Sequence, residues 1–410
     1  MSKTTAPATR PERVRGLRAD ALPIEVQAGA RRPLGMPAAD FLRDYWQKRP
    51  LLVRGAFPGF ESPLDPGDLA GLACEDGVLA RIVRHDRTRD RWTLEQGPFP
   101  EAMFPDMPDR DWTLLVQDVD KWDADVRALL DRFDFIPRWR IDDVMISFAA
   151  PGGSVGAHVD QYDVFLLQAL GRRRWQIDSR PGAPLEFRPD VDLRLLRSFD
   201  PDHDWVLGPG DMLYLPPGVP HHGVAEDACL TCSIGMRAPS AAELMGDFVD
   251  TLAADADDGL RYRDPDLAPA RDPDEIDAAA MARAIEALNL LRMNDPERLG
   301  DWFGRFITLY RSAHQPAAAD AAAAPADIGR ALRAGARLHR HPWTRMAWRR
   351  SGKAARLYVA GEDHALPLRD ARALAAGATI DDAAYAALGA AARALVGDLL
   401  ARGHYALDAG

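Results

Sequence analysis

Three side chains in the sequence have the types and the spacing of a metal site. His158 and Asp160 stand two residues apart in PGGSVGAHVDQYDVF, a segment with the composition of a β-strand. Successive side chains of a strand point to opposite faces, so these two share a face and can bind one ion together. His221 follows about sixty residues later, in GDMLYLPPGVPHHG, and we expect the two segments to lie on neighbouring strands.

Two imidazoles and one carboxylate also define the chemistry of such a site. They occupy one face of an ion and leave three positions open, which non-haem iron(II) oxygenases need for a cosubstrate and dioxygen. A structural zinc site closes a tetrahedron with four ligands, and a catalytic zinc site keeps a single open position. The ligand set therefore predicts an iron(II) oxygenase whose open positions take a cosubstrate and dioxygen, and the cosubstrate that we expect is 2-oxoglutarate.

The pair His158 and Asp160 has a structural interpretation too, as a core histidine and a turn carboxylate. The second segment favours the metal site, because Gly210, Pro216 and His221 have a spacing similar to that of the second conserved box of cupin barrels. His222 is a rival ligand on the same strand, but alternation turns it away from the face of His221.

The cosubstrate needs a cation inside the barrel, and the segment GRRRWQI offers one. If Trp175 and Ile177 point inward, Arg173 points inward with them, while Arg172 and Arg174 face out. A buried guanidinium is costly unless it meets an anion, and it fits a carboxylate with two parallel hydrogen bonds. Arg173 is thus the candidate for the distal carboxylate of 2-oxoglutarate; the alternative is an internal Asp or Glu partner.

A second aligned set lies in DDVMISF, where Asp143, Met145 and Ser147 share one face of a predicted strand. The Ser147 hydroxyl can donate to the same carboxylate as Arg173. Asp143 can receive a basic group of a substrate, and Met145 can supply an apolar wall beside it.

Short apolar segments punctuated by Gly and Pro predict the strands that position these residues. The expected strands are 112–119, 142–150, 164–170, 173–177 and 211–217, with helices at 38–48 and 124–133. From 241 to 300 the pattern is helical, and 15 acidic residues stand against 6 basic ones. Near the C-terminus we expect a two-stranded wing with a turn at 361–363, a helix over 383–400 and a final strand at 404–407.

The predicted fold class is α+β: a double-stranded β-helix (jelly-roll, cupin) barrel, then a helical domain, then a small winged-helix-like domain. The expected divisions are a disordered leader (1–22), the catalytic barrel (23–240), the helical domain (241–314), a Pro- and Ala-rich linker (315–327) and the winged-helix-like domain (328–410).

Several of these segments, taken together, resemble those of a known family. DDVMISFAAPGGSVGAHVDQYDVFLLQALGRRRWQI, PGDMLYLPPGVPHHG and the early FLRDYWQKRPLLVRGAF are similar to segments of the bacterial JmjC-type ribosomal oxygenases, which hydroxylate an arginine of a large-subunit ribosomal protein. The resemblance covers most of the first 240 residues and also implies a dimerisation domain and a C-terminal winged helix. It implies iron at His158, Asp160 and His221, 2-oxoglutarate at Ser147 and Arg173, and the substrate arginine at Asp143, Met145 and Tyr162. One departure is His222, where we expect an acidic residue.

Composition excludes several other classes of protein. The sequence has no apolar run long enough to cross a membrane and no secretory signal, so we expect a cytoplasmic protein. Three cysteines are too few for a disulfide framework, and Cys229 and Cys232 are interpreted as core residues rather than half of a zinc site. The net charge of −11 argues against a nucleic-acid protein.

Alternatives stay open at this point. The reaction could be that of a JmjC histidyl hydroxylase acting on another ribosomal protein, although a carboxylate at Asp143 favours a guanidinium over an imidazole. Segment 326–356 carries nine basic residues against one acidic residue, so the chain could instead be a non-catalytic metal-binding cupin whose C-terminal domain binds DNA. The 241–300 helices could form a homodimer interface or a docking site for a basic ribosomal protein.

Overall fold

The structure, a computed structural model, describes residues 22–29, 33–265, 267–269, 274–291, 295–309, 316–317 and 324–408. The predicted leader lies almost entirely outside these residues, as does the middle of the predicted linker. By its internal contacts the chain divides into two compact units. The first takes in the chain up to Ala73 with 80–116 and 145–235, and the second takes in 74–79, 117–144 and 236–410.

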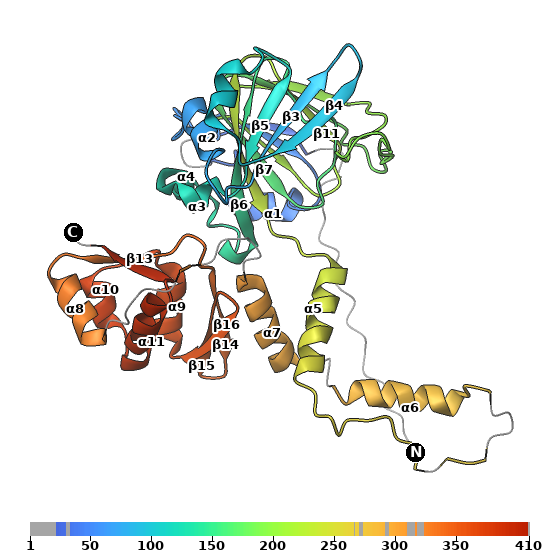
Figure 1. The fold of residues 1–410 in the computed structure, drawn as a ribbon, viewed down its shortest axis with the longest axis vertical. Helices are drawn as coiled ribbons and strands as arrows, with labels where there is room; N and C mark the ends of the chain where they lie inside the picture. The colour runs from blue at the N-terminus through green and yellow to red at the C-terminus, as the bar shows by residue number, and fades with distance from the viewer. Residues whose placement is uncertain are drawn as a thin grey trace, which may run out of the picture. The chain divides into compact units, whose positions relative to one another are not determined.

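The first unit is built on a nine-stranded sheet in the order β1-β2-β10-β7-β12-β6-β5-β3-β4, drawn in blue to yellow-green in Figure 1. The chain returns repeatedly to the middle of this sheet, so strands far apart in sequence become neighbours. Its strands are β1 (Glu25–Gln27), β2 (Leu51–Arg54), β3 (Ala80–Asp86), β4 (Arg91–Gln96), β5 (Trp112–Val116), β6 (Ile141–Ala149), β7 (Val164–Leu170), β10 (Met212–Leu215) and β12 (Cys229–Met236). The helices α1 (Ala38–Asp44), α2 (Pro66–Leu72) and η2 (Glu101–Asp106) connect them.

A second, three-stranded sheet completes the barrel. It has the order β11-β8-β9 and consists of β8 (Arg173–Ile177), β9 (His203–Leu207) and β11 (His221–Ala225). An apolar core joins the two sheets: Leu52, Val164, Leu166, Leu213 and Leu215 of the large sheet pack with Trp175, Ile177 and Leu207 of the small one. Two packed sheets that exchange strands in this way form a double-stranded β-helix, which confirms the predicted fold class.

The second unit holds three kinds of structure. Short helices α3 (Val119–Trp122), α4 (Ala124–Ala128), η3 (Leu129–Phe133) and η4 (Arg138–Arg140) precede strand β6. Three longer helices follow the barrel: α5 (Ala241–Ala254), α6 (Ala278–Asn289) and α7 (Pro296–Thr308). Helices α5 and α7 share a core of Phe248, Leu252, Trp302, Phe306 and Ile307.

The C-terminal part has the mixed helix and strand content of a winged helix. It contains α8 (Pro325–Arg333), β13 (Arg337–Arg340), β14 (Met346–Ser351), β15 (Ala354–Val359), β16 (Glu362–Leu366), α9 (Leu368–Ala376), β17 (Thr379–Ile380), α10 (Asp382–Ala387), α11 (Ala390–Ala401) and β18 (Tyr405–Asp408). The strands form two three-stranded sheets, β17-β13-β18 and β14-β15-β16. Their common core includes Ile328, Leu338, Leu357, Leu374 and Val396.

Most of the predicted elements are present, and the differences have local causes. The helix predicted over 124–133 continues after Ala128 as the 3-10 helix η3. The helix predicted over 383–400 is broken, because Leu388 adopts an extended conformation and Gly389 begins α11. The wing has three strands instead of two. Its turn lies at Ala360 and Gly361, whose positive φ angles suit a two-residue hairpin turn.

Two further observations concern segments outside the barrel. Helix α8 begins at Pro325, inside the segment predicted as linker, and proline is well accommodated in the first turn of a helix. Among the described residues, no helix is both long enough and apolar enough to cross a membrane.

Candidate metal and cosubstrate site

His158 and His221 lie directly opposite one another. The His158 N–H donates to the His221 carbonyl at 3.0 Å, and the His221 N–H donates to the His158 carbonyl at 2.9 Å. His221 begins strand β11, but His158 makes only this isolated antiparallel bridge, so the strand predicted around His158 is wrong. The main chain of Asp160 is also tied to the segment that carries His221, because the Gly218 N–H donates to the Asp160 carbonyl at 2.8 Å.

The hydrogen bonds of the two rings fix which nitrogen faces the ion. Nδ1 of His158 lies 3.0 Å from the Gly156 carbonyl oxygen, and Nδ1 of His221 lies 2.9 Å from that of Val219. A carbonyl can only accept, so each Nδ1 carries the proton and each Nε2 is left with a lone pair for a metal.

Both Nε2 atoms face the Asp160 carboxylate. The separations are 4.0 Å from His158 Nε2 to Oδ1 and 3.6 Å from His221 Nε2 to Oδ2, and one ligand atom from each residue lies within 4.8 Å of the other two. Ligands about 2.1 Å from one ion at right angles to each other stand about 3 Å apart, so small side-chain adjustments close the site around an ion. Among the described residues no other group of three His, Cys, Asp or Glu side chains has this arrangement.

Burial keeps His221 in the neutral form that metal binding requires. His221 is 2% exposed, and burial, followed by the charge of His158, lowers the pKa of His221 to about 4 although Asp160 opposes the shift. A neutral His221 imidazole can bind a metal ion through its free lone pair and does not form an ion pair with Asp160. His158 and Asp160 are half-buried, so one side of the triad is open.

The rival histidine lies outside the triad, as alternation predicts. His222 is half-buried on the other face of β11, and its ring makes an edge contact with Phe199 at 6.1 Å between centroids. Burial, followed by the nearby Arg173 charge, lowers the pKa of His222 to about 4.

The interpretation of the cysteines as core residues also agrees with the structure. Cys229 and Cys232 are buried and free, and burial raises the pKa of the Cys232 thiol to about 12.

Arg173 is buried in the barrel, with 2% of its surface exposed. Nη1 donates to Ser147 Oγ at 3.3 Å and Nη2 to the Gly223 carbonyl at 3.3 Å, while Nε has no hydrogen-bond partner. Burial lowers the pKa of the guanidinium, which nevertheless stays protonated. No carboxylate of the described residues forms an ion pair with Arg173, so the expected alternative, an internal Asp or Glu partner, is not found there. A buried, unpaired guanidinium beside a hydroxyl fits an incoming carboxylate.

Gly223 belongs to this site, although sequence reasoning missed it. Register places it opposite Trp175 on β8, and a Cβ built at Gly223 would lie 2.7 Å from Arg173 Nε and from the Trp175 ring. The guanidinium stacks over that ring, with 4.9 Å between Arg173 Cζ and the ring centroid. The sequence does place a glycine directly after His221 and His222. Its importance becomes clear only from the pairing of β8 with β11, which sets it against Arg173 and Trp175.

Three residues were predicted to hold a substrate. Asp143 belongs to the second unit, where its Oδ2 accepts the Asp118 N–H at 3.1 Å. Burial of the carboxyl group, followed by the negative charge of Asp118, raises the pKa of Asp143 to about 7. Met145 and Ser147 follow Asp143 at alternate positions of β6, as predicted. Tyr162, two residues after Asp160, is 43% exposed.

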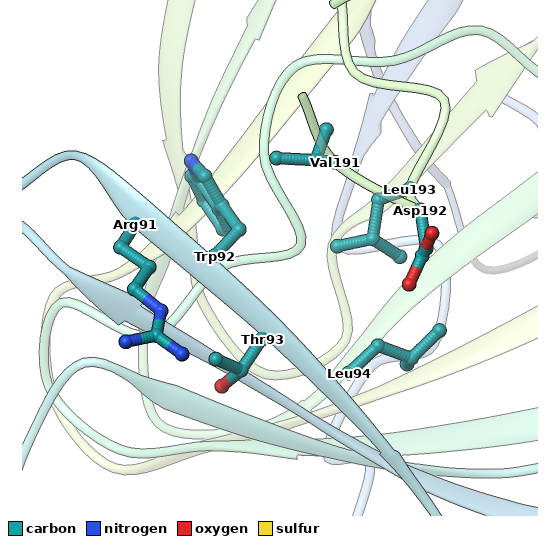
Figure 2. A pocket seen from close by; sticks show the side chains of 7 residues that line it. All are labelled: Arg91, Trp92, Thr93, Leu94, Val191, Asp192 and Leu193. Carbon is teal, nitrogen blue, oxygen red and sulfur yellow. The ribbon is translucent and has the colours of Figure 1, made fainter. Parts of the chain in front are cut away.

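A separate hollow of about 220 Å³ lies beside edge strand β4. Figure 2 shows its lining, in which Trp92, Thr93 and Leu94 of β4 face the loop segment 191–193. None of the predicted site residues lines this hollow, so it is distinct from the His158 triad.

Comparison with protein families adds an independent observation. Residues 128–244 match the JmjC domain, residues 291–406 match the ROXA-like winged helix and residues 198–323 match the AraC-like ligand binding domain. An Escherichia coli relative described as "Ribosomal protein uL16 3-hydroxylase" is 41% identical over 275 residues, which are 66% of this chain and 71% of that protein. A Haemophilus influenzae relative described as "Probable ribosomal oxygenase" is 41% identical over 228 residues, 55% of this chain and 54% of that protein.

Solved structures show the same likeness over a greater length. The structure of Escherichia coli YcfD matches with a TM-score of 0.83 and 35% identity, and covers 92% of this chain and 99% of that one. A structure of the same ribosomal oxygenase in complex with cobalt and 2-oxoglutarate matches with a TM-score of 0.80 over the same shares. Another holds cobalt and succinic acid.

Proposed function

The chain belongs to the JmjC-type ribosomal oxygenases, and from that premise we propose that it hydroxylates the β-carbon of an arginine in ribosomal protein uL16. It uses iron(II), 2-oxoglutarate and dioxygen. The observation that carries this function is the pairing, in one barrel, of a triad with three open coordination positions and a buried guanidinium without a carboxylate partner.

We assign the metal ligands as His158 Nε2, Asp160 and His221 Nε2. Their support is the ring orientation, since each Nδ1 is held by a carbonyl oxygen, and the burial of His221. When bound, iron(II) and 2-oxoglutarate supply the oxidising chemistry, in which dioxygen hydroxylates the substrate and the cosubstrate becomes succinate and carbon dioxide. The protein contributes position and the exclusion of water.

We assign Arg173 and Ser147 to the distal carboxylate of 2-oxoglutarate. The two side chains already contact each other at 3.3 Å, so a carboxylate can accept hydrogen bonds from both donors. Arg173 is also fixed by the Gly223 carbonyl and by its stacking on Trp175, which sets the direction of its remaining N–H groups.

We assign the substrate arginine to Asp143, Met145 and Tyr162. Burial, followed by the charge of Asp118, raises the pKa of Asp143, and a guanidinium suits this carboxyl group because a paired cation favours its ionised form. The Met145 side chain adds an apolar wall, and the exposed Tyr162 ring offers a face to a cation. An imidazole satisfies such a carboxylate less well than a guanidinium does, so arginine is favoured over histidine as the target.

The decisive experiment incubates the purified protein with iron(II), 2-oxoglutarate and a uL16 peptide that contains the arginine. Intact-mass analysis should show one added oxygen, and fragmentation should place it on the arginine. The His158→Ala variant is the inactive control, and a histidine-containing ribosomal peptide tests the other reaction. Oxygen added only to that histidine, or to neither peptide, would overturn the assignment.

We also propose that the protein is a cytoplasmic homodimer that associates through helices α5 and α6. Helix α6 has no buried residue, and it exposes Met281, Ile285 and Leu288, which lie on one face at helical spacing. Light scattering of the Ile285→Glu variant should then give the monomer mass. An unchanged dimer mass would exclude α6 as the interface.

Nucleic-acid binding by segment 326–356 receives less support. Four of its basic residues pair with carboxylates within the second unit, which reduces the free positive charge. These are Arg330, Arg345, Arg349 and Arg356.

A further inference from the structure

Arg345 of the C-terminal part holds the start of strand β6 within the second unit. Its Nη2 donates to the Asp142 carbonyl at 2.7 Å and to Asp142 Oδ1 at 2.6 Å. The Arg345 side chain is 12% exposed and the Asp142 side chain 47% exposed, so the guanidinium is largely buried while the carboxylate stays partly open to solvent. The main chain of Arg345 is fixed as well, because the Ala360 N–H donates to its carbonyl at 3.0 Å.

Asp142 precedes Asp143, the residue to which we assign the substrate guanidinium. The residue on the other side, Val144, is also held, because its N–H donates to Asp120 Oδ1 at 2.8 Å. Lys121 Nζ adds a longer contact of 3.3 Å to the Asp142 carbonyl. Both neighbours of Asp143 are thus anchored, and its own Oδ2 accepts the Asp118 N–H at 3.1 Å. The direction of the Asp143 carboxylate depends on all three contacts.

Charge gives these contacts a second role. Four carboxylates gather here: Asp118 and Asp120 around the start of α3, and Asp142 and Asp143 on β6. Lys121 pairs with Asp120, and Arg345 pairs with Asp142. No cation of the described residues forms an ion pair with Asp143 itself. The cluster therefore leaves the Asp143 carboxylate for an external cation, while Arg345 neutralises the adjacent Asp142 carboxylate.

We propose that Arg345 is a positioning residue for the substrate: by gripping both the carbonyl and the carboxylate of Asp142, it sets the adjacent Asp143 carboxylate to receive the arginine guanidinium. This inference rests on the proposed arginine hydroxylation. It gives the C-terminal winged-helix-like domain a part in substrate recognition that does not involve nucleic acid.

A purely structural role for Arg345 predicts different measurements. If the contact only stabilises the fold, its loss lowers the melting temperature and affects all kinetic constants through the folded fraction. If it positions Asp143, its loss raises the peptide KM and leaves the cosubstrate KM unchanged, because Arg173 and Ser147 do not depend on Asp142.

The test compares Arg345→Ala and Arg345→Lys with Arg402→Ala, in the full-length protein with iron(II). Arg402 pairs with Glu362 in the same unit and serves as the matched control for loss of an ion pair. We expect Arg345→Ala to raise the peptide KM about 10-fold, with the cosubstrate KM and the peptide-independent turnover within about twofold of wild type. Arg345→Lys should recover part of the loss, because an ammonium keeps the charge but not the planar fork.

The pH dependence of kcat/KM for the peptide separates the two roles further, because a loss of stability alone does not shift its inflection. Without the Arg345 charge, Asp142 repels a second negative charge more strongly, so the inflection of kcat/KM for the peptide should move to higher pH. An unchanged peptide KM in Arg345→Ala, or an equal rise in Arg402→Ala, would overturn the positioning role. Absence of peptide hydroxylation by the wild type would instead overturn the proposed function, so the two failures are distinguishable.

Discussion

The main chains of His158 and His221 exchange a pair of hydrogen bonds, so the two histidines that we propose as metal ligands are fixed relative to each other although far apart in sequence. Their ring centroids are 4.3 Å apart. Each ring is oriented by the carbonyl two residues before it, Gly156 for His158 and Val219 for His221. Backbone carbonyl groups therefore orient the rings of both proposed ligands.

Loss of a ligand should strongly weaken ion binding while leaving the fold intact. In His221→Ala the β-bridge to His158 persists, because it uses only main-chain atoms, but the ion loses one of three ligands. We expect cobalt(II) or iron(II) affinity to fall about 100-fold or more, since even partners that merely support ligands contribute 10- to 100-fold. Calorimetric titration with cobalt(II) measures this. The adjacent His222→Ala is the matched control and should bind the ion normally; equal losses in both variants would refute the assignment.

Arg173 should contribute to cosubstrate binding at the expense of stability. An unpaired buried guanidinium is destabilising, so Arg173→Met should leave the free energy of unfolding without cosubstrate unchanged or raise it by about 1–4 kcal/mol. The same change should raise the cosubstrate KM about 100-fold or more, because a buried charge pair lost from a binding site costs about 3–5 kcal/mol. Denaturant unfolding with and without 2-oxoglutarate, together with steady-state kinetics, measures both effects. A variant that is less stable yet binds 2-oxoglutarate normally would show that Arg173 is structural.

Gly223 should be required for the position of Arg173. A methyl group at this residue would meet Arg173 Nε and Trp175 at 2.7 Å, so in Gly223→Ala the guanidinium or the ring must shift. We expect the cosubstrate KM to rise about 10-fold with the metal affinity retained, a loss within the range for a displaced supporting contact. Gly208→Ala is the control, because a Cβ there meets nothing within 4 Å. Steady-state kinetics at varied 2-oxoglutarate decides, and identical KM values for the two variants would contradict the role of Gly223.

The barrel and the grouping of most candidate site residues were predictable because side-chain alternation is a local property. Strands 164–170 and 173–177 have the predicted bounds, and the inward position of Arg173 followed from its parity with Trp175. His158 shows the limit of that reasoning: its partnership with His221 was predicted, but the segment around it is not a strand. For His158, the spacing from Gly210 to His221 was the informative signal, whereas the alternation of side chains along a strand was not.

What could not be predicted depends on contacts between distant segments. Gly223 matters only because β11 lies beside β8, and nothing near residue 223 reveals that pairing. The contact of Arg345 with Asp142 joins residues about 200 positions apart, in segments predicted to belong to different domains. The break at Leu388 and Gly389 was missed for the opposite reason, since the Ala-rich pattern is helical on both sides and a single glycine gives a weak signal.

The ionisation of Asp143 should appear directly in the pH dependence of substrate use. Burial and the charge of Asp118 raise the pKa of Asp143 to about 7 in the free protein, and a guanidinium binds the ionised carboxylate better than the neutral acid. As the pH falls through 7, the Asp143 carboxylate of the free protein takes up a proton. We therefore expect kcat/KM for the peptide to drop about tenfold per pH unit below the inflection and to be constant above it. With peptide saturating, the inflection of kcat should lie at lower pH, because the bound cation stabilises the charged form. In Asp143→Asn the inflection should vanish and the peptide KM should be high at every pH, while peptide-independent conversion of 2-oxoglutarate continues. An inflection near pH 7 that survives in Asp143→Asn would assign the titration to another group and remove Asp143 from the receptor.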